Sequence, residues 1–284
     1  MRIDGNTRVF FVLGHPVAQV RAPEVFNPLF QAHGVNAVLV PAHVAPERLE
    51  AFVRGVPGAA NMDGLWLTIP HKTAVMDLLG RIDRLGQRAG AVNAVRRLAD
   101  GTLEGALFDG LGLLKSLGQL GVATTGRRVL LVGTGGAGMA IAVSLAEQAL
   151  AELALFDVAP ARAATVAQRL APGAACPVTA AVSSDPAGFD VVIHATPLGL
   201  NANDPLPFDV SRLDFGATVV DILMKPYATP LQRACDARGI TNHPGFEMLA
   251  QQVPEYLRFF GYDDIASAVE TDLDPVRRSL TALT

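Results

Sequence analysis

The chain has 284 residues, half of them apolar and 6% aromatic, and its 23 basic and 27 acidic side chains give a formal charge of −4. This length predicts one large or two medium domains, each with enough apolar residues for its own core. The mild negative charge excludes a basic surface for nucleic acid and a polybasic stretch for a membrane surface, so we expect neither partner.

The first apolar run is short and is cut by Gly14, His15 and Pro16, which is not typical of a secretory signal. The most apolar region, residues 129–155, holds glycines that fit a strand, a turn and a helix better than a membrane span. The two cysteines form neither a CxxC pair nor a disulfide framework. We therefore expect a cytoplasmic protein.

Short β-branched runs alternate with segments of helical length along the first third of the chain. The expected strands are residues 8–14, 36–44 and 65–70, and the expected helices are residues 23–34, 46–56 and 71–79. Strands that alternate with helices imply a parallel sheet with helices on both faces.

The same alternation restarts at Arg128. Strands are expected at residues 129–133, 152–157, 189–196 and 216–223, with helices at residues 136–151 and 161–171. This run predicts a Rossmann-like, doubly wound domain. A last helix is expected at residues 246–260, kinked or interrupted by Pro254. We predict an α/β chain in which residues 1–105 and 241–284 form one domain and residues 106–240 the other.

A glycine-rich loop follows the strand at 129–133 and opens the next helix. It reads Gly133, Thr134, Gly135, Gly136, Ala137, Gly138. Gly133 permits a tight turn, Gly135 lets the backbone approach a pyrophosphate, and Gly138 permits close packing of the helix on the strand. Phosphates then lie at the helix N-terminus, whose free N–H groups favour anions. A bare glycine-rich turn is the alternative, but the strand before it and the helix after it favour a dinucleotide site.

Asp157 ends the next expected strand, 24 positions after Gly133. An acidic residue at about this distance accepts hydrogen bonds from the ribose hydroxyls of NAD, whereas the 2′-phosphate of NADP would meet a like charge there. A turn cap is the structural alternative for Asp157. We predict that the cofactor is NAD.

Seven segments, in order, resemble motifs of the shikimate dehydrogenase family along nearly the whole chain. They are GHPVAQVRAP (14–23), GLWLTIPHK (64–72), GAVNAV (90–95), GALFDGLGLL (105–114), GTGGAG (133–138), HATPLGL (194–200) and GFEMLAQQ (245–252). The resemblance implies a substrate-binding domain completed by the C-terminal helices, a central cofactor domain, and reversible oxidation of a shikimate-like or quinate-like ring alcohol to a ketone.

The resemblance also implies a catalytic pair, because Lys72 lies where the family keeps its catalytic lysine and Asp109 where it keeps its aspartate. Oxidation of a secondary alcohol moves a hydride to the nicotinamide and removes a proton from the hydroxyl. A lysine can accept that proton when burial favours its neutral form, and an aspartate can orient the lysine and the hydroxyl. Taken alone, Lys72 reads as a solvated helix residue and Asp109 as a helix N-cap. Their joint placement in matching motifs favours catalysis.

Other positions match ligand contacts of the family. Thr68, Asn93 and Gln252 match substrate contacts, although the adjacent Gln251 leaves the register of Gln252 open. The resemblance assigns cofactor contacts to the glycine-rich loop, Asp157, Arg162, Thr196, Pro197 and Met224. No metal is expected, since no His, Cys and Asp cluster has ligand spacing.

Several positions depart from the family pattern, each toward an apolar residue. The two serines that hold a carboxylate in the family's substrate loop are Val20 and Ala22 here, an expected asparagine is Trp66, and an expected tyrosine is Met224. A carboxylate buried without partners costs several kcal/mol. These changes put shikimate itself in doubt as the best substrate, unless Arg21, between the two lost serines, supplies the charge.

The cofactor loop departs as well, because NADP-using members usually carry Asn-Arg-Thr where this chain has Asp157, Val158 and Ala159. The remaining Arg162 is expected to stack on the adenine. Two alternatives stay open: a dehydrogenase for another cyclic alcohol, such as an amino-substituted analogue or a carboxylate-free polyol, and a non-catalytic NAD-binding regulator. Lys72 and Asp109 argue against the regulator. A homodimer is possible.

Overall fold

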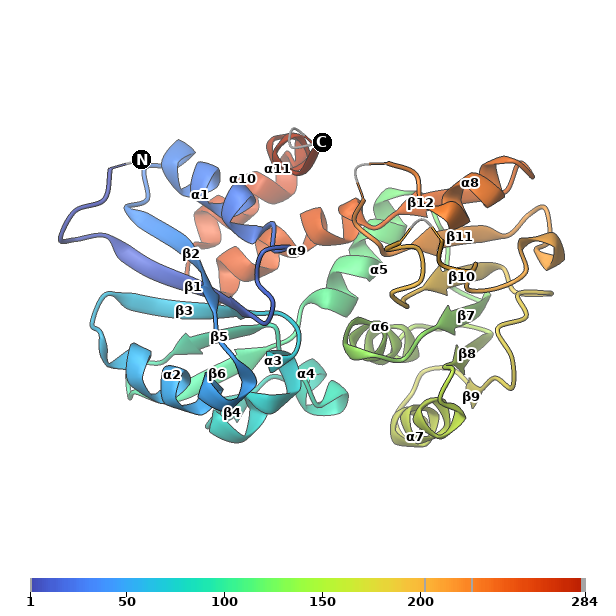
Figure 1. Ribbon diagram of the computed structural model, residues 1–284, viewed down its shortest axis with the longest axis horizontal. Helices are drawn as coiled ribbons and strands as arrows, with labels where there is room; N and C mark the ends of the chain where they lie inside the picture. The colour runs from blue at the N-terminus through green and yellow to red at the C-terminus, as the bar shows by residue number, and fades with distance from the viewer. Residues whose placement is uncertain (1, 202, 226, 282–284) are drawn as a thin grey trace. The chain divides into compact units, whose positions relative to one another are not determined.

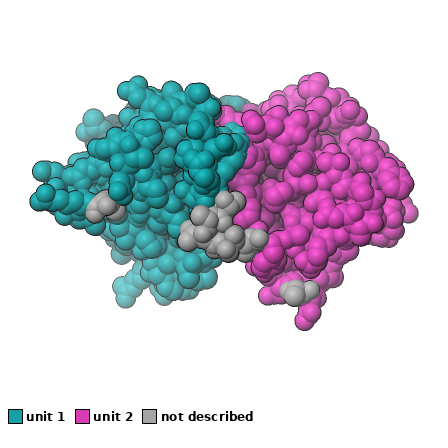
Figure 2. Space-filling view, turned by 90° about the horizontal axis from the view of Figure 1, so that it is seen from above, with its two compact units in different colours: residues 1–108, 250–284 teal, residues 109–249 magenta. Residues whose placement is uncertain are grey.

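The computed structural model describes residues 2–201, 203–225 and 227–281. The chain divides into two compact units, unit 1 (Met1–Phe108 and Ala250–Thr284) and unit 2 (Asp109–Leu249), coloured teal and magenta in Figure 2. These divisions fall three and nine residues after the predicted ones. No helix in the described part of the chain is long and apolar enough to cross a membrane.

Unit 1 is built on a mixed sheet with the strand order β2-β1-β3-β5-β6-β4 (Figure 1). Its strands are β1 (Arg8–Gly14), β2 (Ala37–His43), β3 (Met62–Leu67), β4 (Arg81–Ile82), β5 (Ala94–Arg97) and β6 (Leu103–Ala106). The first three run parallel, as predicted. The prediction of a parallel sheet is wrong for β5, which runs antiparallel to both β3 and β6.

The antiparallel pair follows from its turn. Asp100 accepts a hydrogen bond from the N–H of Thr102 at 2.9 Å, and Gly101 has a φ of +86°. Such a conformation is open to glycine, and Asp-Gly between two strands is a hairpin signal. The sequence therefore contained the information for this hairpin.

Helices cover both faces of this sheet, as predicted. The elements are α1 (Ala22–Ala32), η1 (Pro46–Arg48), α2 (Leu49–Gly55), η2 (Val56–Gly58), α3 (His71–Ala74), η3 (Met76–Leu78), α4 (Arg84–Ala89), α9 (Phe246–Phe259), α10 (Asp263–Thr271) and α11 (Asp274–Thr281). The expected helix at 71–79 is thus the short α3 followed by η3. α9 continues through Pro254, where we expected a kink or break, because buried residues such as Val253 and Leu257 hold it in the core.

Unit 2 has an all-parallel sheet with the order β12-β11-β10-β7-β8-β9, which confirms the predicted Rossmann-like fold. Its elements are α5 (Asp109–Gln119), β7 (Arg128–Val132), α6 (Gly136–Ala146), β8 (Glu152–Phe156), α7 (Pro160–Leu170), β9 (Val178–Ala180), β10 (Val191–His194), η4 (Val210–Arg212), β11 (Thr218–Asp221), α8 (Pro230–Asp236) and β12 (Thr241–Pro244). The strand order reverses beside β7, and ligands of such sheets bind at the carboxyl ends of the strands at this point.

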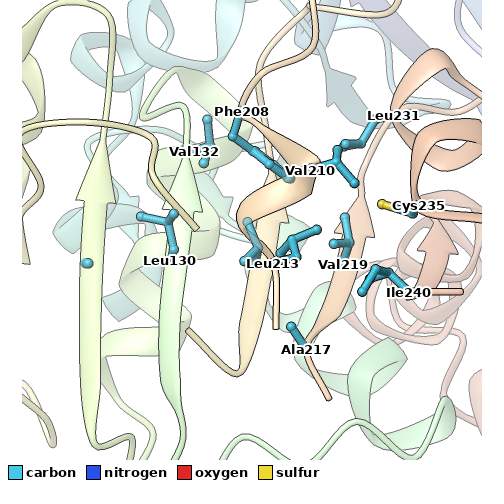
Figure 3. Packing of buried hydrophobic residues seen from close by; sticks show 12 residues of the cluster. Leu130, Val132, Phe208, Val210, Leu213, Ala217, Val219, Leu231, Cys235 and Ile240 are labelled. Atoms are coloured by element: carbon cyan, nitrogen blue, oxygen red, sulfur yellow. The ribbon is translucent and has the colours of Figure 1, made fainter. Parts of the chain in front are cut away.

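One apolar cluster fixes these strand ends. Leu130 and Val132 of β7 pack with Phe208, with Val219 of β11 and with Leu231 of α8 (Figure 3). Burying side chains of this size stabilises the fold by about 1.5–3 kcal/mol each. The backbone that leaves β7, and with it the glycine-rich loop, therefore starts from a rigid point.

A glycine in α5 controls how closely α5 packs on α6. A Cβ on Gly110 would lie 2.2 Å from the carbonyl oxygen of Ala140 and 2.3 Å from the Ser144 hydroxyl, whereas a Cβ on Gly118 of the same helix would meet nothing within 4 Å. Of Gly110 and Gly118, packing therefore requires only Gly110 to be a glycine.

Gly110→Ala should therefore lower the free energy of unfolding by about 1–3 kcal/mol, the usual cost of overpacking. Gly118→Ala is the matched control and should leave stability unchanged or raise it by up to about 1 kcal/mol, because alanine favours helix. Thermal unfolding of both variants measures the difference. Equal stability of the two variants would contradict this account of the α5–α6 contact.

Candidate active site

The predicted substrate loop and the strand-and-lysine motif meet at the carboxyl ends of β1 and β3 in unit 1. The N–H of Thr68 donates to the carbonyl of Leu13 at 2.9 Å, and a Cβ on Gly14 would lie 2.7 Å from the Thr68 methyl group. The N–H of His71 in turn donates to the carbonyl of Thr68 at 2.9 Å. Thr68 is thereby fixed between the start of the loop and the start of α3.

Lys72 lies on α3, whose position is held by its neighbours. The buried ring of His71 lies with Nε2 2.7 Å from the carbonyl of Val44, and burial lowers the pKa of His71, so the ring is neutral and Nε2 donates. The carbonyl of Lys72 accepts the N–H of Val92 at 2.9 Å. The half-buried Lys72 thus projects from a short turn that is fixed on both sides.

Asn93, buried at 1% exposure, connects several predicted site segments. Its Oδ1 accepts the N–H of Phe108 at 3.0 Å, and its Nδ2 lies 3.5 Å from Oε1 of Gln252. Its carbonyl accepts the hydroxyl of Tyr256 at 3.3 Å. Of the two glutamines between which the register was left open, Gln252 faces Asn93, and both are buried.

Asp109 directly follows Phe108 and is the first residue of both α5 and unit 2. Its side chain is 7% exposed. Four of the predicted site residues therefore belong to unit 1: Thr68, Lys72, Asn93 and Gln252. Asp109 is the next residue after Phe108, where the chain passes from unit 1 to unit 2.

Trp66 lies in the core of unit 1 and is 3% exposed. Its ring stacks on Tyr256 at 5.3 Å and on Phe260 at 4.3 Å and meets the edge of Phe10 at 5.1 Å. Its Nε1 has no hydrogen-bond partner among the residues that the structure describes. Leu65 and Leu67, its neighbours in β3, pack on the opposite face of the sheet. The run of three consecutive apolar residues, Leu65, Trp66 and Leu67, was the signal for a strand that is buried on both faces.

The two apolar positions of the substrate loop, Val20 and Ala22, are half-buried at the start of α1. Arg21 between them pairs with the Glu24 carboxylate and donates to the carbonyl of Leu280 in α11 at 3.1 Å. Its guanidinium is therefore engaged with the α1 and α11 segments.

A histidine pair that the sequence analysis did not single out lies at the same edge of the sheet. Nδ1 of His15, after β1, and Nε2 of His43, at the end of β2, lie 2.9 Å apart. The parallel strands β1 and β2 bring the two rings together. Aligning the ends of these two strands in the sequence would have predicted the histidine pair.

In unit 2, the glycines of the nucleotide loop have distinct roles. Gly133 has a φ of +101°, and a Cβ on Gly138 would lie 2.0 Å from the Gly133 carbonyl oxygen. A Cβ on Gly135 or Gly136 would meet nothing within 4 Å, and both residues are exposed, with Ala137 half-buried after them. No contact among the described residues requires these two glycines, so the open backbone fits a ligand that approaches it closely.

Asp157 turns its carboxylate into this loop and is only 5% exposed. Oδ2 accepts the N–H and the hydroxyl of Thr134, each at 2.9 Å, and Oδ1 accepts the N–H of Ala159 at 2.9 Å. Burial alone would raise the pKa of Asp157, but these hydrogen bonds and the nearby Arg162 outweigh it and lower the pKa. Arg162, 57% exposed, lies 3.4 Å from the carboxylate.

A pocket of about 240 Å³ opens beside this loop within unit 2. Its lining includes Gly133, Gly135, Asp157, Arg162, Thr196 and Pro197. Six of the ten predicted cofactor residues thus line this pocket, and the other four do not: Gly136, Ala137, Gly138 and Met224, which is partly exposed after β11. Its size and mixed apolar and polar lining suit part of a dinucleotide.

Comparisons with known proteins show which family the chain resembles. The family model for the shikimate dehydrogenase substrate binding domain matches residues 12–95. The chain is 38% identical, over 99% of its length and 98% of the relative's, to "Shikimate dehydrogenase (NADP(+))" of Rubrobacter xylanophilus.

Solved structures resemble the chain over its whole length. Shikimate dehydrogenase from Aquifex aeolicus matches with a TM-score of 0.87 and 26% identity, covering 98% of this chain and 99% of that one. The ligand-free 5-ketofructose reductase of Gluconobacter sp. strain CHM43 matches with a TM-score of 0.85 and 26% identity at the same coverage.

The prediction of NAD is wrong. The relative at 38% identity and others at 34–36% all carry NADP(+) in their names. The error lies in how Asp157 was interpreted: its carboxylate is occupied by Thr134 and Ala159 inside the loop and is partly neutralised by Arg162. It is therefore no bare negative charge facing a 2′-phosphate.

The nucleotide loop yields a prediction that separates binding from folding. Gly135→Ala should leave thermal stability unchanged, because its φ of −69° suits alanine and its Cβ meets nothing, yet weaken dinucleotide binding at least about tenfold. Gly138→Ala should instead lower stability, because its Cβ collides with the Gly133 backbone. Calorimetric titration and thermal unfolding measure both. Wild-type affinity in the Gly135→Ala variant would refute the close approach.

Proposed function

The chain belongs to the shikimate dehydrogenase family, and from that premise we propose that it is an NADP-dependent dehydrogenase that reversibly oxidises a secondary ring alcohol to a ketone. The observation that carries the proposal is the buried amide of Asn93. Its Oδ1 accepts the N–H of Phe108, the residue before Asp109, and its Nδ2 faces Gln252. The preceding residue, Val92, donates its N–H to the carbonyl of Lys72. These bonds hold the segments that carry the proposed lysine, aspartate and glutamine to one side chain, as joint acid-base chemistry on one substrate requires.

The chemistry divides among a few side chains. When bound, the nicotinamide cofactor supplies the hydride acceptor. Lys72 takes the proton from the alcohol in oxidation and returns it in reduction, and Asp109 orients the lysine and the hydroxyl. The ring hydroxyls are held by the half-buried Thr68, which follows β3, and by the buried Asn93 and Gln252, which face each other.

The residues of unit 2 support NADP. The N–H groups at the start of α6 are open beside Gly135 and Gly136, as a pyrophosphate requires. Arg162 keeps more than half of its side chain exposed on the pocket lining. An exposed guanidinium can pair with a phosphate in a bidentate manner, which is stronger than a neutral contact.

A second candidate substrate class is a ring polyol or ketone without a carboxylate. Val20 and Ala22 offer no hydroxyl donors, and Arg21 is engaged by Glu24 and the carbonyl of Leu280. The similar fold of 5-ketofructose reductase, whose named substrate has no carboxylate, supports the same class. The two candidates share the Lys72 chemistry and differ only at the substrate loop.

Lys72→Met should lower turnover by a factor of about 10² to 10⁴, the usual contribution of a general acid-base group. Affinity for NADP should stay within about twofold, because Lys72 belongs to unit 1 and the cofactor pocket to unit 2. Lys115→Met in α5 is the control. Wild-type turnover in the Lys72→Met variant would remove the lysine from the mechanism.

Arg162→Ala should raise the dissociation constant of NADP about tenfold and leave that of NAD within about twofold, because only NADP carries the phosphate that the guanidinium meets. Arg169→Ala, in the last turn of the same helix α7, is the matched control. Titration of both cofactors measures the effect. An equal loss for NAD and NADP would assign Arg162 to the adenine instead.

The substrate loop can be tested by restoring its donors. A hydrogen bond to a charged group contributes roughly 1.5–3 kcal/mol, so Val20→Ser with Ala22→Ser should lower the Michaelis constant for shikimate at least about tenfold. The Michaelis constant for shikimate methyl ester, which lacks the charge, should change less than about twofold. A low micromolar constant for shikimate in the wild type would show that another group already holds the carboxylate.

A further inference from the structure

A fully buried aspartate and histidine lie behind the hydroxyl of Thr196 on the cofactor pocket. We propose that His194 is a positioning residue that accepts a hydrogen bond from the hydroxyl of Thr196. Thr196 then presents only an acceptor to a hydroxyl or N–H donor of the dinucleotide. This inference rests on the proposed function for the identity of that ligand. The orientation of the Thr196 hydroxyl stands on the geometry of unit 2 alone.

The aspartate and histidine are brought together by the sheet. His194 ends β10 and Asp221 ends β11, and the two residues are partners in the parallel register. Both are 0% exposed, and Nδ1 of His194 lies 3.0 Å from Oδ1 of Asp221. The pair is thus set by the backbone and not by flexible side chains.

The Asp221 carboxylate is surrounded by donors among the described residues. Oδ2 accepts the hydroxyl of Thr229 at 2.6 Å, and Oδ1 accepts the N–H of Leu223 at 3.2 Å. An ionised carboxylate can only accept hydrogen bonds. Nδ1 of His194 therefore carries a proton and donates it to Asp221.

The second ring nitrogen decides the direction of the next bond. Nε2 of His194 lies 2.6 Å from Oγ1 of Thr196. In the proposed arrangement His194 is the neutral imidazole with its proton on Nδ1, in which Nε2 is an acceptor and the threonine hydroxyl donates. Oγ1 also accepts the N–H of Leu198 at 3.1 Å, which leaves one lone pair for the pocket that Thr196 lines.

The same three groups form the geometry of a hydrolytic triad, in which a hydroxyl attacks a carbonyl. A triad histidine must pass its proton to a leaving group, but the ring of His194 has no exposed surface. The geometry therefore serves orientation: Asp221 fixes the tautomer of His194, and His194 fixes the rotor of Thr196.

The first test reads the tautomer without any cofactor. ¹⁵N NMR of the full-length chain, with His194→Asn used to assign the signals, should show Nδ1 protonated and Nε2 unprotonated at neutral pH. A protonated Nε2 would overturn the proposal, because Thr196 would then accept from His194 and be free to donate into the pocket.

The second test asks whether His194 acts through Thr196. Thr196→Val and His194→Leu should each raise the dissociation constant of NADP about 3- to 10-fold in calorimetry, the loss expected for one hydrogen bond. If His194 acts only by orienting Thr196, the double variant should bind no more weakly than Thr196→Val. Thr196→Ser should retain wild-type affinity, because it keeps the oxygen.

The outcomes distinguish the inference from the proposed function. Additive losses in the double variant, or unchanged affinity in His194→Leu, would overturn the role of His194. Should His194→Leu fail to fold, His194→Gln replaces it in the cycle, and the wild-type tautomer still decides the orientation. Absence of NADP binding by the wild type would instead contradict the proposed function and, with it, the ligand named here.

Discussion

The buried amide of Asn93 cannot be left unpaired without a cost of about 1–3 kcal/mol, and the paths of its neighbours are set by that requirement. Its Oδ1 accepts the N–H of Phe108, and its Nδ2 faces Gln252. Its carbonyl oxygen accepts both the N–H of Leu67 in β3 and the hydroxyl of Tyr256 in α9. The chain segments that carry the lysine, the aspartate and the glutamine are thus tied to one side chain. Removal of that amide would loosen the proposed chemistry before it unfolded the sheet, because the apolar cores on the two faces do not depend on it.

Unit 2 uses the same principle at a different place. Asp157 and Asp221 are both buried carboxylates, and each accepts hydrogen bonds from its own strand end and from a second segment: Thr134 of the glycine-rich loop for Asp157, and Thr229 at the start of α8 for Asp221. One holds the glycine-rich loop, and the other holds His194 behind Thr196. Two internal carboxyl groups therefore shape the pocket from behind, while the exposed Arg162 and the open backbone at Gly135 are left for the ligand.

Much of this was accessible from the sequence, because it depends on local pattern. The strand-turn-helix at Gly133 and the Rossmann-like run follow from periodicity and residue type. The roles of Lys72 and Asp109 came instead from the resemblance of their segments to family motifs. The sequence did not reveal in which direction individual side chains point. Asp157 has the expected position but points inward, and Trp66 falls in a substrate motif but faces the core. The pairing of His194 with Asp221 arises only when two distant strands come into register.

The central claim is that these residues form a working NADP-dependent alcohol dehydrogenase. Its most direct test is the initial rate of cofactor reduction by the full-length chain, with shikimate, quinate, their methyl esters and a ring polyol without a carboxylate, measured with NADP and with NAD. The account predicts reduction of NADP by at least one of these alcohols, with kcat/KM at least about tenfold above that with NAD, a difference of about 1.4 kcal/mol. Failure of every alcohol to reduce either cofactor, in a chain that binds NADP, would contradict it.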